Sequence, residues 1–584
     1  MLFRSILSLA AVFVALLLSF SSTARGRFLQ FVEVQLHEKE RLVYGLVALV
    51  LGLGVLAFIF GVFETRLQLK LPAVLPYYHT LVWLLLWALL SGLQSALLSL
   101  LLYPSAWKNL FHIPAVKLRR LAWWLLGGGT LAALAAYGLT TILNLGIFHF
   151  FIGFFLLFLL VLAVFNFLWG HYADRPWYSE AGLYLTALLI FCVSICAYRA
   201  GTFITGFSAT PLKSYFDLLA DAWLHGRLYL IDPPYTHDLT LYNGNWYVAN
   251  PPLAAILLVP WVALLGVTGL NTVIITVGCA AFTVALIYVF LQRLSSMGWS
   301  KLKTVDNLWL TALFGFGTPL WYISASGTMW SMSQVITVML LVLSVSVMLT
   351  HNSALLSGLA LALAAMARPH IFVFFPILLA LRIIHTRRSG QKFGFIQFVS
   401  WGFATAFPVF LAGLLMLGYN WLRFGNILDY GYLTENVADF MADDLKLYGT
   451  FNPVFIGRNL GIMLFSLPRW SEYCAAFTHT FDGMSMFLTI PALFYLFKSF
   501  RRSTLVMGAW GSVLLTLVPL MLYYNTGAWQ FGYKYLLDFI VPVMVLLAVA
   551  AGERLSWLYR LLIVLSICMQ GYGVLWFFKV ICRA

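Results

Sequence analysis

The sequence predicts an all-α membrane protein whose helices cross the bilayer about 16 times. Of its 584 residues, 62% are hydrophobic and 9% are charged, whereas about a quarter of the residues of a typical soluble domain are charged. The mean hydropathy is +0.92. Apolar stretches of about 17–25 residues, the length that spans a bilayer, recur along the whole chain. We therefore expect loops between spans and no large soluble domain.

The charge pattern argues against a nucleic-acid partner, and the cysteine pattern argues against disulfides and a zinc site. The net charge of +15 would suggest nucleic acid in a soluble protein, but here the basic residues mostly occupy short loops between spans, as the positive-inside rule predicts. We expect no nucleic-acid partner. The six cysteines lie mostly within or beside apolar runs and lack CxxC or CxxH spacing. The sequence therefore predicts no cofactor and supports neither a disulfide framework nor a divalent metal.

The most basic short loops orient the predicted spans, because cytoplasmic loops are enriched in Lys and Arg. Four loops qualify, at 106–120, 292–303, 385–392 and 498–503. Counting from them places two long loops, 207–251 and 419 to about 480, on the extracytoplasmic side. The predicted spans are listed from the one that precedes the loop 207–251. They lie at 182–206, 272–293, 308–324, 330–349, 354–367, 369–384, 394–418, 483–498, 504–522, 536–551 and 557–578.

Two apolar segments need separate interpretation. The segment 252–267 has no crossing to make between its neighbours. With Pro252 and Pro260, and about 16 residues, it is expected to lie in the interface or to re-enter the membrane. The first apolar run, 5–22, is interpreted as a retained span rather than a cleaved secretory signal, because further spans follow it.

The loop 207–251 concentrates ionisable side chains at the membrane surface. A helix over 213–229 would place Asp217, Asp221 and His225 at i, i+4 and i+8 on one face. Any interfacial helix needs such a polar face. At the depth of a lipid phosphate, however, a carboxylate is partly desolvated, which raises its pKa toward that of a general base.

The rest of this loop is expected to form a folded lid. Asn243-Gly244 predicts a two-residue β-hairpin turn. His237 and Asp238 precede the hairpin, but the sequence identifies no further residues that would complete a metal site or a catalytic triad with them.

Three cations lie near the predicted extracytoplasmic ends of spans. They are Arg199, Arg368 in MARPHIF and Lys534 in GAWQFGYKYLLDF. Because a charge in hydrocarbon is costly, each is expected to face a cavity, an anion or the headgroup layer. Salt bridges or snorkelling would explain a lone arginine. Together with the loop carboxylates, the three cations favour a site for a phosphate-bearing lipid.

Four stretches of this sequence resemble the GT-C superfamily of polytopic glycosyltransferases, which includes the protein O-mannosyltransferases and the aminoarabinose transferases of lipid A. The resemblance is to uncharacterised bacterial members and covers about 182–542. The stretches are ADAWLHGRLYL (220–230) with LYNGNWYVANPPLAAILLVP (241–260), SGLALALAAMARPHIFVFFP (357–376), YNWLRFGNILDYGY (419–432) and WQFGYKYLLDFIVP (529–542).

The resemblance implies a domain organisation. The core is expected to be a seven-helix GT-C-like bundle at 182–418 that carries the first extracytoplasmic loop, 207–251. An added transmembrane module at 1–181 precedes it, and a second extracytoplasmic loop and the last helices follow at 419–584.

The resemblance also implies an activity. Such enzymes transfer a sugar from a polyprenyl-phosphate donor to an acceptor hydroxyl on the extracytoplasmic face, with a loop carboxylate as general base. Better-known members carry that acid a few positions before the amphipathic helix, where this chain has Leu212 and Lys213. We therefore take Asp221 as the base and Asp217 as the alternative.

Other residues receive roles by the same resemblance. The donor phosphate is assigned to Arg368, with Arg199 and Lys534 as further candidates. The candidates for the acceptor side or the loop are His225, His237, Asp238, Asp429 and Tyr432.

The expected partners are the polyprenyl-phosphate sugar, a glycan, lipid or protein acceptor, and membrane lipids. The expected location is the bacterial cytoplasmic membrane, with the site extracytoplasmic. Two other functions fit the same features, a lipid or glycan flippase and a ligase or polymerase that uses a polyprenyl-diphosphate donor. The products distinguish them: a transferase releases polyprenyl phosphate, a ligase or polymerase releases the diphosphate, and a flippase releases neither.

Overall fold

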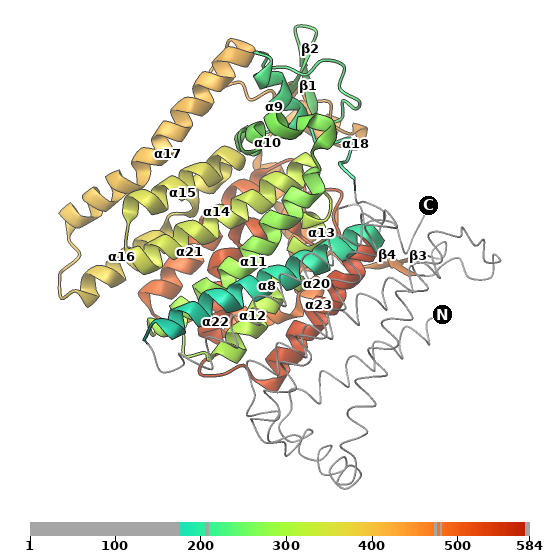
Figure 1. Cartoon of the computed structure of the whole chain (residues 1–584). Helices are drawn as coiled ribbons and strands as arrows, with labels where there is room; N and C mark the ends of the chain where they lie inside the picture. Colours follow the sequence, from blue (N-terminus) through green and yellow to red (C-terminus); the bar gives the residue numbers. More distant parts are fainter. Residues whose placement is uncertain (1–175, 205–208, 472–475, 479–481, 578–584) are drawn as a thin grey trace. The chain divides into compact units, whose positions relative to one another are not determined.

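The computed structural model describes residues 176–204, 209–471, 476–478 and 482–577 (Figure 1). The chain divides into two compact units, 1–185 and 186–584, of which the second contains nearly all the described residues. The predicted module at 1–181, including the first span at 5–22, lies almost wholly outside them.

The described residues are mostly helical, and seven helices among them are long and apolar enough to cross a membrane. This confirms the prediction of an all-α integral membrane protein, whereas the total of about 16 crossings stays a prediction. The seven candidate spans are Glu180–Thr202, Thr272–Ser296, Met329–His351, Pro369–Arg388, Phe395–Phe424, Thr504–Leu522 and Trp557–Phe577.

The secondary structure follows the hydrophobic pattern of the chain, and three of the five 3₁₀ segments in the described residues begin at a proline. The α-helices are α8 (Pro176–Ile204), α9 (Phe216–Leu224), α10 (Leu253–Gly269), α11 (Thr272–Ser296), α12 (Thr304–Phe316), α13 (Leu320–Ser324), α14 (Met329–His351), α15 (Ala354–Ala367), α16 (Pro376–Arg388), α17 (Phe395–Phe424), α18 (Asp439–Tyr448), α19 (Ile456–Phe465), α20 (Met486–Thr489), α21 (Thr504–Leu522), α22 (Ile540–Ala550) and α23 (Trp557–Phe577). The 3₁₀ helices are η1 (Pro369–Phe374), η2 (Tyr432–Thr434), η3 (Pro453–Phe455), η4 (Pro491–Lys498) and η5 (Lys534–Phe539), and the strands are β1 (Leu239–Tyr242), β2 (Asn245–Val248), β3 (Arg469–Ser471) and β4 (Ala476–Thr478).

The predicted interruption at Arg368 is present. Helix α15 ends at Ala367, Arg368 is extended (φ −143°, ψ 100°), and Pro369 begins η1. Proline disfavours the helical conformation in the residue before it, so the sequence Arg-Pro ends α15 at this point. The break takes Arg368 out of any helix and directs its side chain into a cavity described below.

The loop after α8 folds against the bundle much as its turn signals predict. Asn243 (φ 48°) and Gly244 (φ 77°) form the two-residue turn between the antiparallel strands β1 and β2, as a type I′ hairpin requires. Helix α9 is shorter than the predicted 213–229, since Gly226 adopts φ 70° just after it. Helix α9 packs on α10, the 17-residue apolar helix that contains Pro260.

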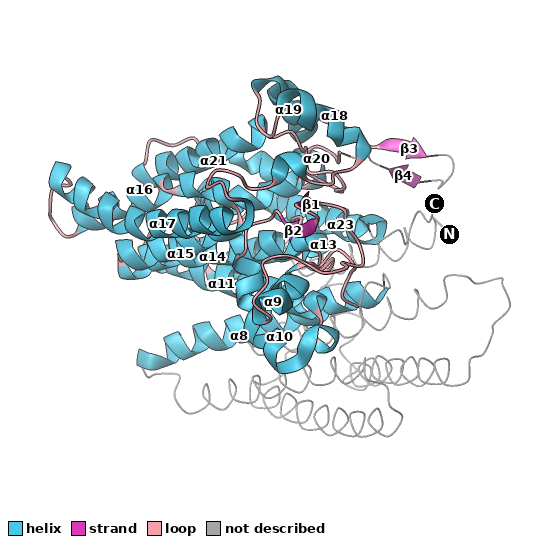
Figure 2. Cartoon of the chain, turned by 90° about the horizontal axis from the view of Figure 1, so that it is seen from above, coloured by secondary structure: helices cyan, strands magenta, loops and turns pink. Residues whose placement is uncertain are grey.

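Hydrogen bonds fix the hairpin to the end of α17 and to the second loop. Arg423 donates to the carbonyl of Val248 at 2.7 Å, and the hydroxyl of Tyr242 donates to the carbonyl of Phe424 at 3.1 Å. The hydroxyl of Thr240 donates to the carbonyl of Gly431 at 2.7 Å. Seen from above, the hairpin lies between α9 and the α18–α19 pair (Figure 2).

The basic loops meet at the other end of the bundle. The Arg388 guanidinium stacks on the Trp299 ring with 3.8 Å between its central carbon and the ring centroid, and Arg387 donates to the hydroxyl of Thr504 at 3.4 Å. The predicted loops 292–303, 385–392 and 498–503 thus lie together. Helix α11, with 25 residues, joins the end that carries the hairpin to this basic end (Figure 1).

Helices α14, α15 and α17 lie side by side (Figure 2), and glycine permits the close approach of α15 to α17. A Cβ atom on Gly358 would lie 2.3 Å from the carbonyl oxygen of Thr405 in α17. Backbone atoms cannot yield as a flexible side chain can. We infer that Gly358 sets the spacing of these two helices.

Replacing Gly358 with alanine should therefore destabilise the bundle by about 1–3 kcal/mol, the usual cost of overpacking. The measurement is the thermal unfolding midpoint of the purified protein in detergent. The matched control is Gly402→Ala on α17, where an added Cβ meets nothing within 4 Å; it should be neutral or slightly stabilising, because alanine favours helix. Equal midpoints for the two variants would contradict the packing argument.

Candidate functional site

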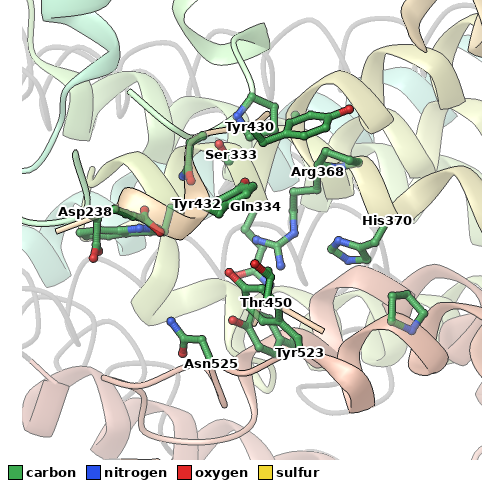
Figure 3. A pocket seen from close by; sticks show the side chains of 18 of the residues that line it. Asp238, Ser333, Gln334, Arg368, His370, Tyr430, Tyr432, Thr450, Tyr523 and Asn525 are labelled. Carbon is green, nitrogen blue, oxygen red and sulfur yellow. The ribbon is translucent and has the colours of Figure 1, made fainter. Parts of the chain in front are cut away.

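A cavity of about 1790 Å³ lies between the two long loops and the bundle. Its wall combines the first loop, the start of α14, the break at Arg368, α17, the second loop and the segment between α21 and α22. Figure 3 shows the labelled side chains, with Asp238 at one side of the view, His370 at the other and Arg368 between them. The cavity therefore joins segments that are far apart in the sequence.

One part of the cavity wall is apolar and comes from membrane-spanning helices. Its side chains belong to α17, η1 and the end of α21, and many neighbouring positions on α17 are exposed. Such a surface suits a hydrocarbon chain. The apolar lining residues are Phe372, Val373, Val409, Ala412, Met416, Val518, Pro519, Leu520 and Leu522.

The cationic part of the wall is organised by a buried carboxylate, Asp538 of η5. The Arg368 guanidinium donates from Nη2 to Asp538 at 2.8 Å, and Nε2 of His370 lies 3.1 Å from the same oxygen. Gln334 of α14 donates to the other carboxylate oxygen at 3.3 Å. The Asp538 side chain is fully buried, whereas the Arg368 side chain is 16% exposed, and both Arg368 and His370 line the cavity.

Asp538 occupies only one nitrogen of the guanidinium, and the Arg368 side chain is 16% exposed, which leaves room for a ligand. Nε of Arg368 is buried and has no hydrogen-bond partner, while Nη2 is held by Asp538. Arginine can offer paired donors to a phosphate. Arg368 is thus a fixed cation beside a large cavity.

Two carboxylates face the same cavity from the two loops. Asp238 adopts φ 60°, a left-handed conformation that costs energy for a non-glycine residue and that is frequent at functional sites. The Asp238 amide donates to the carbonyl of Asn436 at 2.8 Å, and the Asn436 amide donates to the carbonyl of Leu239 at 2.8 Å. This exchange brings Glu435 close to Asp238.

The carboxylates have raised pKa values because protein atoms surround them. Burial raises the pKa of Asp238 to about 6, although the positive charges of Lys213 and Lys534 oppose the shift. Burial and the charge of Asp238 raise the pKa of Glu435 well above its usual range. Both side chains are partly exposed to the cavity. A carboxylate with a pKa near 6 is mostly ionised at neutral pH and remains basic enough to accept a proton.

Two lysines complete the charged lining. Nζ of Lys213 lies 5.0 Å from the centroid of the Tyr235 ring and 5.8 Å from that of Trp330. Burial and the positive charge of Arg368 lower the pKa of Lys534 to about 8. The cavity therefore presents three cations, Lys213, Arg368 and Lys534, beside three carboxylates, Asp238, Asp429 and Glu435.

Six of the residues predicted from the sequence line this cavity. They are Arg368, Lys534, His237, Asp238, Asp429 and Tyr432.

The other four predicted residues are not part of the cavity wall. Asp217 is 2% exposed and accepts a hydrogen bond from the Ser214 hydroxyl at 2.7 Å. Asp221 lies 3.6 Å from His225 on the exposed side of α9. Arg199 is buried in α8 and donates to the Thr202 hydroxyl at 3.2 Å. The predicted ionisable face of α9 is thus divided between a buried and an exposed side.

Sequence reasoning missed several polar residues of the site, among them Lys213, Gln334, His370, Glu435 and Asp538. Asp538 lies in the WQFGYKYLLDF stretch only four residues after Lys534, so a search for a carboxylate partner of Arg368 would have found a candidate there. Gln334 and Glu435 carry no comparable signal, since their contribution depends on tertiary contacts. Among the residues that the structure describes, no group of three or more His, Cys, Asp or Glu side chains lies close enough to hold a metal ion.

Comparison with known proteins finds no matching family model, no similar curated protein and no similar solved structure. Any assignment of function to this chain therefore depends on its own residues.

Removing one partner of the ion pair between Arg368 and Asp538 should destabilise the folded protein strongly. Asp538→Asn leaves a largely buried guanidinium without its counter-charge, which typically costs about 3–5 kcal/mol. Chemical or thermal unfolding in detergent measures the loss. The control is Glu553→Gln, which removes the exposed pair with Lys301 and should cost little, because water screens exposed ion pairs. Similar losses in the two variants would show that the Arg368 side chain is not held as described.

Proposed function

We propose that this protein is an integral membrane glycosyltransferase that moves a sugar from a polyprenyl-phosphate donor to an acceptor hydroxyl on the extracytoplasmic face. The observation that carries the proposal is the cavity itself, which combines an apolar wall on membrane helices, a fixed arginine and partly buried carboxylates. A flippase also needs the first two features, whereas a transferase needs in addition a base that takes the proton of the acceptor hydroxyl.

The orientation is argued from charge. The basic loops gather at one end of the bundle, and the positive-inside rule assigns such an end to the cytoplasm. The cavity lies toward the other end, with the hairpin and α18. The proposed site is therefore extracytoplasmic, in the cytoplasmic membrane of a bacterium.

The donor is assigned to the apolar and cationic parts of the wall. Its isoprenoid chain would lie against α17, η1 and the end of α21. Its phosphate would bind Arg368, with Lys534 beside it. As the sugar leaves, charge develops on the phosphate, and fixed cations in a site of low dielectric constant stabilise that charge.

Asp238 is our candidate for the general base, in place of Asp221 and Asp217, because it faces the cavity and they do not. Its carboxylate would take the proton of the acceptor hydroxyl as the hydroxyl oxygen bonds to the anomeric carbon. The bond from that carbon to the phosphate oxygen breaks on the opposite face, so the configuration inverts. The products are the glycosylated acceptor and polyprenyl phosphate.

The choice of Asp238 also accounts for the position at which this chain differs most from the GT-C pattern. Leu212 and Lys213 occupy the positions at which better-known members carry their acid. Here Asp238, located later in the same loop, would supply the carboxylate, and its backbone bonds to Asn436 hold it in place.

The substitution Asp238→Asn should reduce transfer by about 10²–10⁴-fold, the usual contribution of a general base, while the folded protein still binds polyprenyl phosphate. The assay follows release of polyprenyl phosphate from a polyprenyl-phosphate sugar by the purified protein. Asp221→Asn is the matched control and should keep near-normal turnover. Loss of activity in the control alone would indicate that the base lies on α9. Release of a diphosphate, or of no product, would show that the protein is not a transferase of this kind.

The rate should also depend on pH in a bell shape. Because the base works only when ionised, kcat/KM should rise as the pH increases through about 6. Lys534 loses its charge as the pH passes about 8, so the rate should fall above that value. Lys534→Arg, which stays protonated, should keep the acidic limb and lose the alkaline one. An unchanged alkaline limb in that variant would remove Lys534 from the phosphate site.

A further inference from the structure

A second polar surface of the cavity begins at the amino-terminal end of α14. Trp330, Ser333 and Gln334 have the i, i+3, i+4 spacing of one helical face and all line the cavity. Figure 3 shows Ser333 and Gln334 near the middle of the view, between Asp238 and His370. The first amides of a helix lack partners within it, and the aligned peptide dipoles give this end a partial positive charge.

Lys213 lies next to this first turn. Its carbonyl accepts a hydrogen bond from the Met329 amide at 3.0 Å, and its ammonium group lies over the Trp330 ring. Lys213 takes part in none of the ion pairs formed among the described residues. The ammonium group therefore faces the cavity without a carboxylate in direct contact.

Ser333 supplies an independent indication of a ligand. It is 2% exposed, it lines the cavity, and its hydroxyl has no hydrogen-bond partner. A buried polar group without a partner is costly, and most such groups in proteins are paired. A ligand oxygen in the cavity would provide the missing partner.

The donor cations and Lys213 approach this surface at different residues: Gln334 donates to Asp538 and to the carbonyl of Lys534, whereas Lys213 lies over the Trp330 ring. Arg368 acts electrostatically on Lys534, while both Lys534 and Lys213 act on Asp238. The carboxylate is thus within reach of a cation on the donor side and of another cation beside α14. A ligand held by Lys213 would be near the base.

We propose that Lys213, the first turn of α14 and Ser333 form a second anion-binding site, and that it holds a phosphate group of the acceptor. Its assignment to the acceptor rests on the proposed function, whereas the anion site itself does not. A phosphate suits the donors present, because helix amino termini, lysine and serine hydroxyls recur as its ligands. The acceptor is accordingly a phosphate-bearing molecule.

The test is calorimetric titration of the full chain, in an uncharged maltoside detergent, with inorganic phosphate. It is performed with and without saturating polyprenyl phosphate. We expect phosphate binding that persists when polyprenyl phosphate is bound. Lys213→Gln and Ser333→Ala should each weaken this persistent binding by about tenfold, as expected for loss of a hydrogen bond to a charged group. Lys301→Gln, at the basic end, should bind as the unchanged protein does.

The outcomes separate the two proposals. Persistent binding that neither variant weakens, or complete displacement of phosphate by polyprenyl phosphate, would overturn the second site. If polyprenyl phosphate does not bind, the proposed function fails, but Lys213-dependent phosphate binding would still establish the anion site. Ser333→Ala removes only an unpaired hydroxyl, so it tests the site even if Lys213→Gln disturbs folding.

Two competitors identify the source of the phosphate. Displacement of inorganic phosphate by glucose 6-phosphate, and not by phosphatidylglycerol, would indicate a phosphorylated glycan. The opposite result would indicate a lipid headgroup. If neither competes, the site accepts no substituted phosphate, and the assignment to an acceptor is wrong.

Discussion

The ion pair between Arg368 and Asp538 is the constraint on which the proposed site depends. A charge can stay in an apolar bundle only if it is paired or faces a polar cavity, and this arginine does both. Its position results from the Arg-Pro break that ends α15, and the position of its partner results from η5, which begins at Lys534. Gln334 adds a third segment through its bond to Asp538. One buried carboxylate thus joins three distant parts of the chain around a cavity.

The remaining features of the site follow from where charge can be tolerated. Apolar side chains of α17 and α21 form the part of the wall that belongs to membrane helices, whereas lysines and carboxylates come from loops and helix ends. The exchange of hydrogen bonds between Leu239, Asn436 and Asp238 holds the two loops together. Because these loops cover the cavity and surround their own carboxylates, burial raises the pKa values of Asp238 and Glu435. The packing of the two loops over the cavity therefore also sets the pKa values of these two carboxylates.

Local signals in the sequence predicted those parts of the fold that depend on residues near one another in the chain. The two short apolar stretches around Arg368 predicted the break between α15 and η1, Asn243-Gly244 predicted the hairpin turn, and hydrophobic length predicted the seven helices that are long and apolar enough to cross a membrane. Helix α9 shows the limit of such reasoning. Its periodicity placed Asp217 and Asp221 on one face, but periodicity does not say which neighbours cover that face, and packing buries Asp217 beside Ser214. The positions of Glu435, Gln334 and Asp538 likewise depend on contacts between remote segments, which no local pattern reveals.

A structure of the protein with bound polyprenyl phosphate would test the central claim most directly. We expect the phosphate within hydrogen-bonding distance of the Arg368 guanidinium, the isoprenoid chain along the apolar wall formed by α17 and α21, and the Asp238 carboxylate facing the phosphate across the cavity. A phosphate bound outside this cavity, or a lipid chain that leaves Arg368 in contact with Asp538 alone, would contradict the proposed donor site.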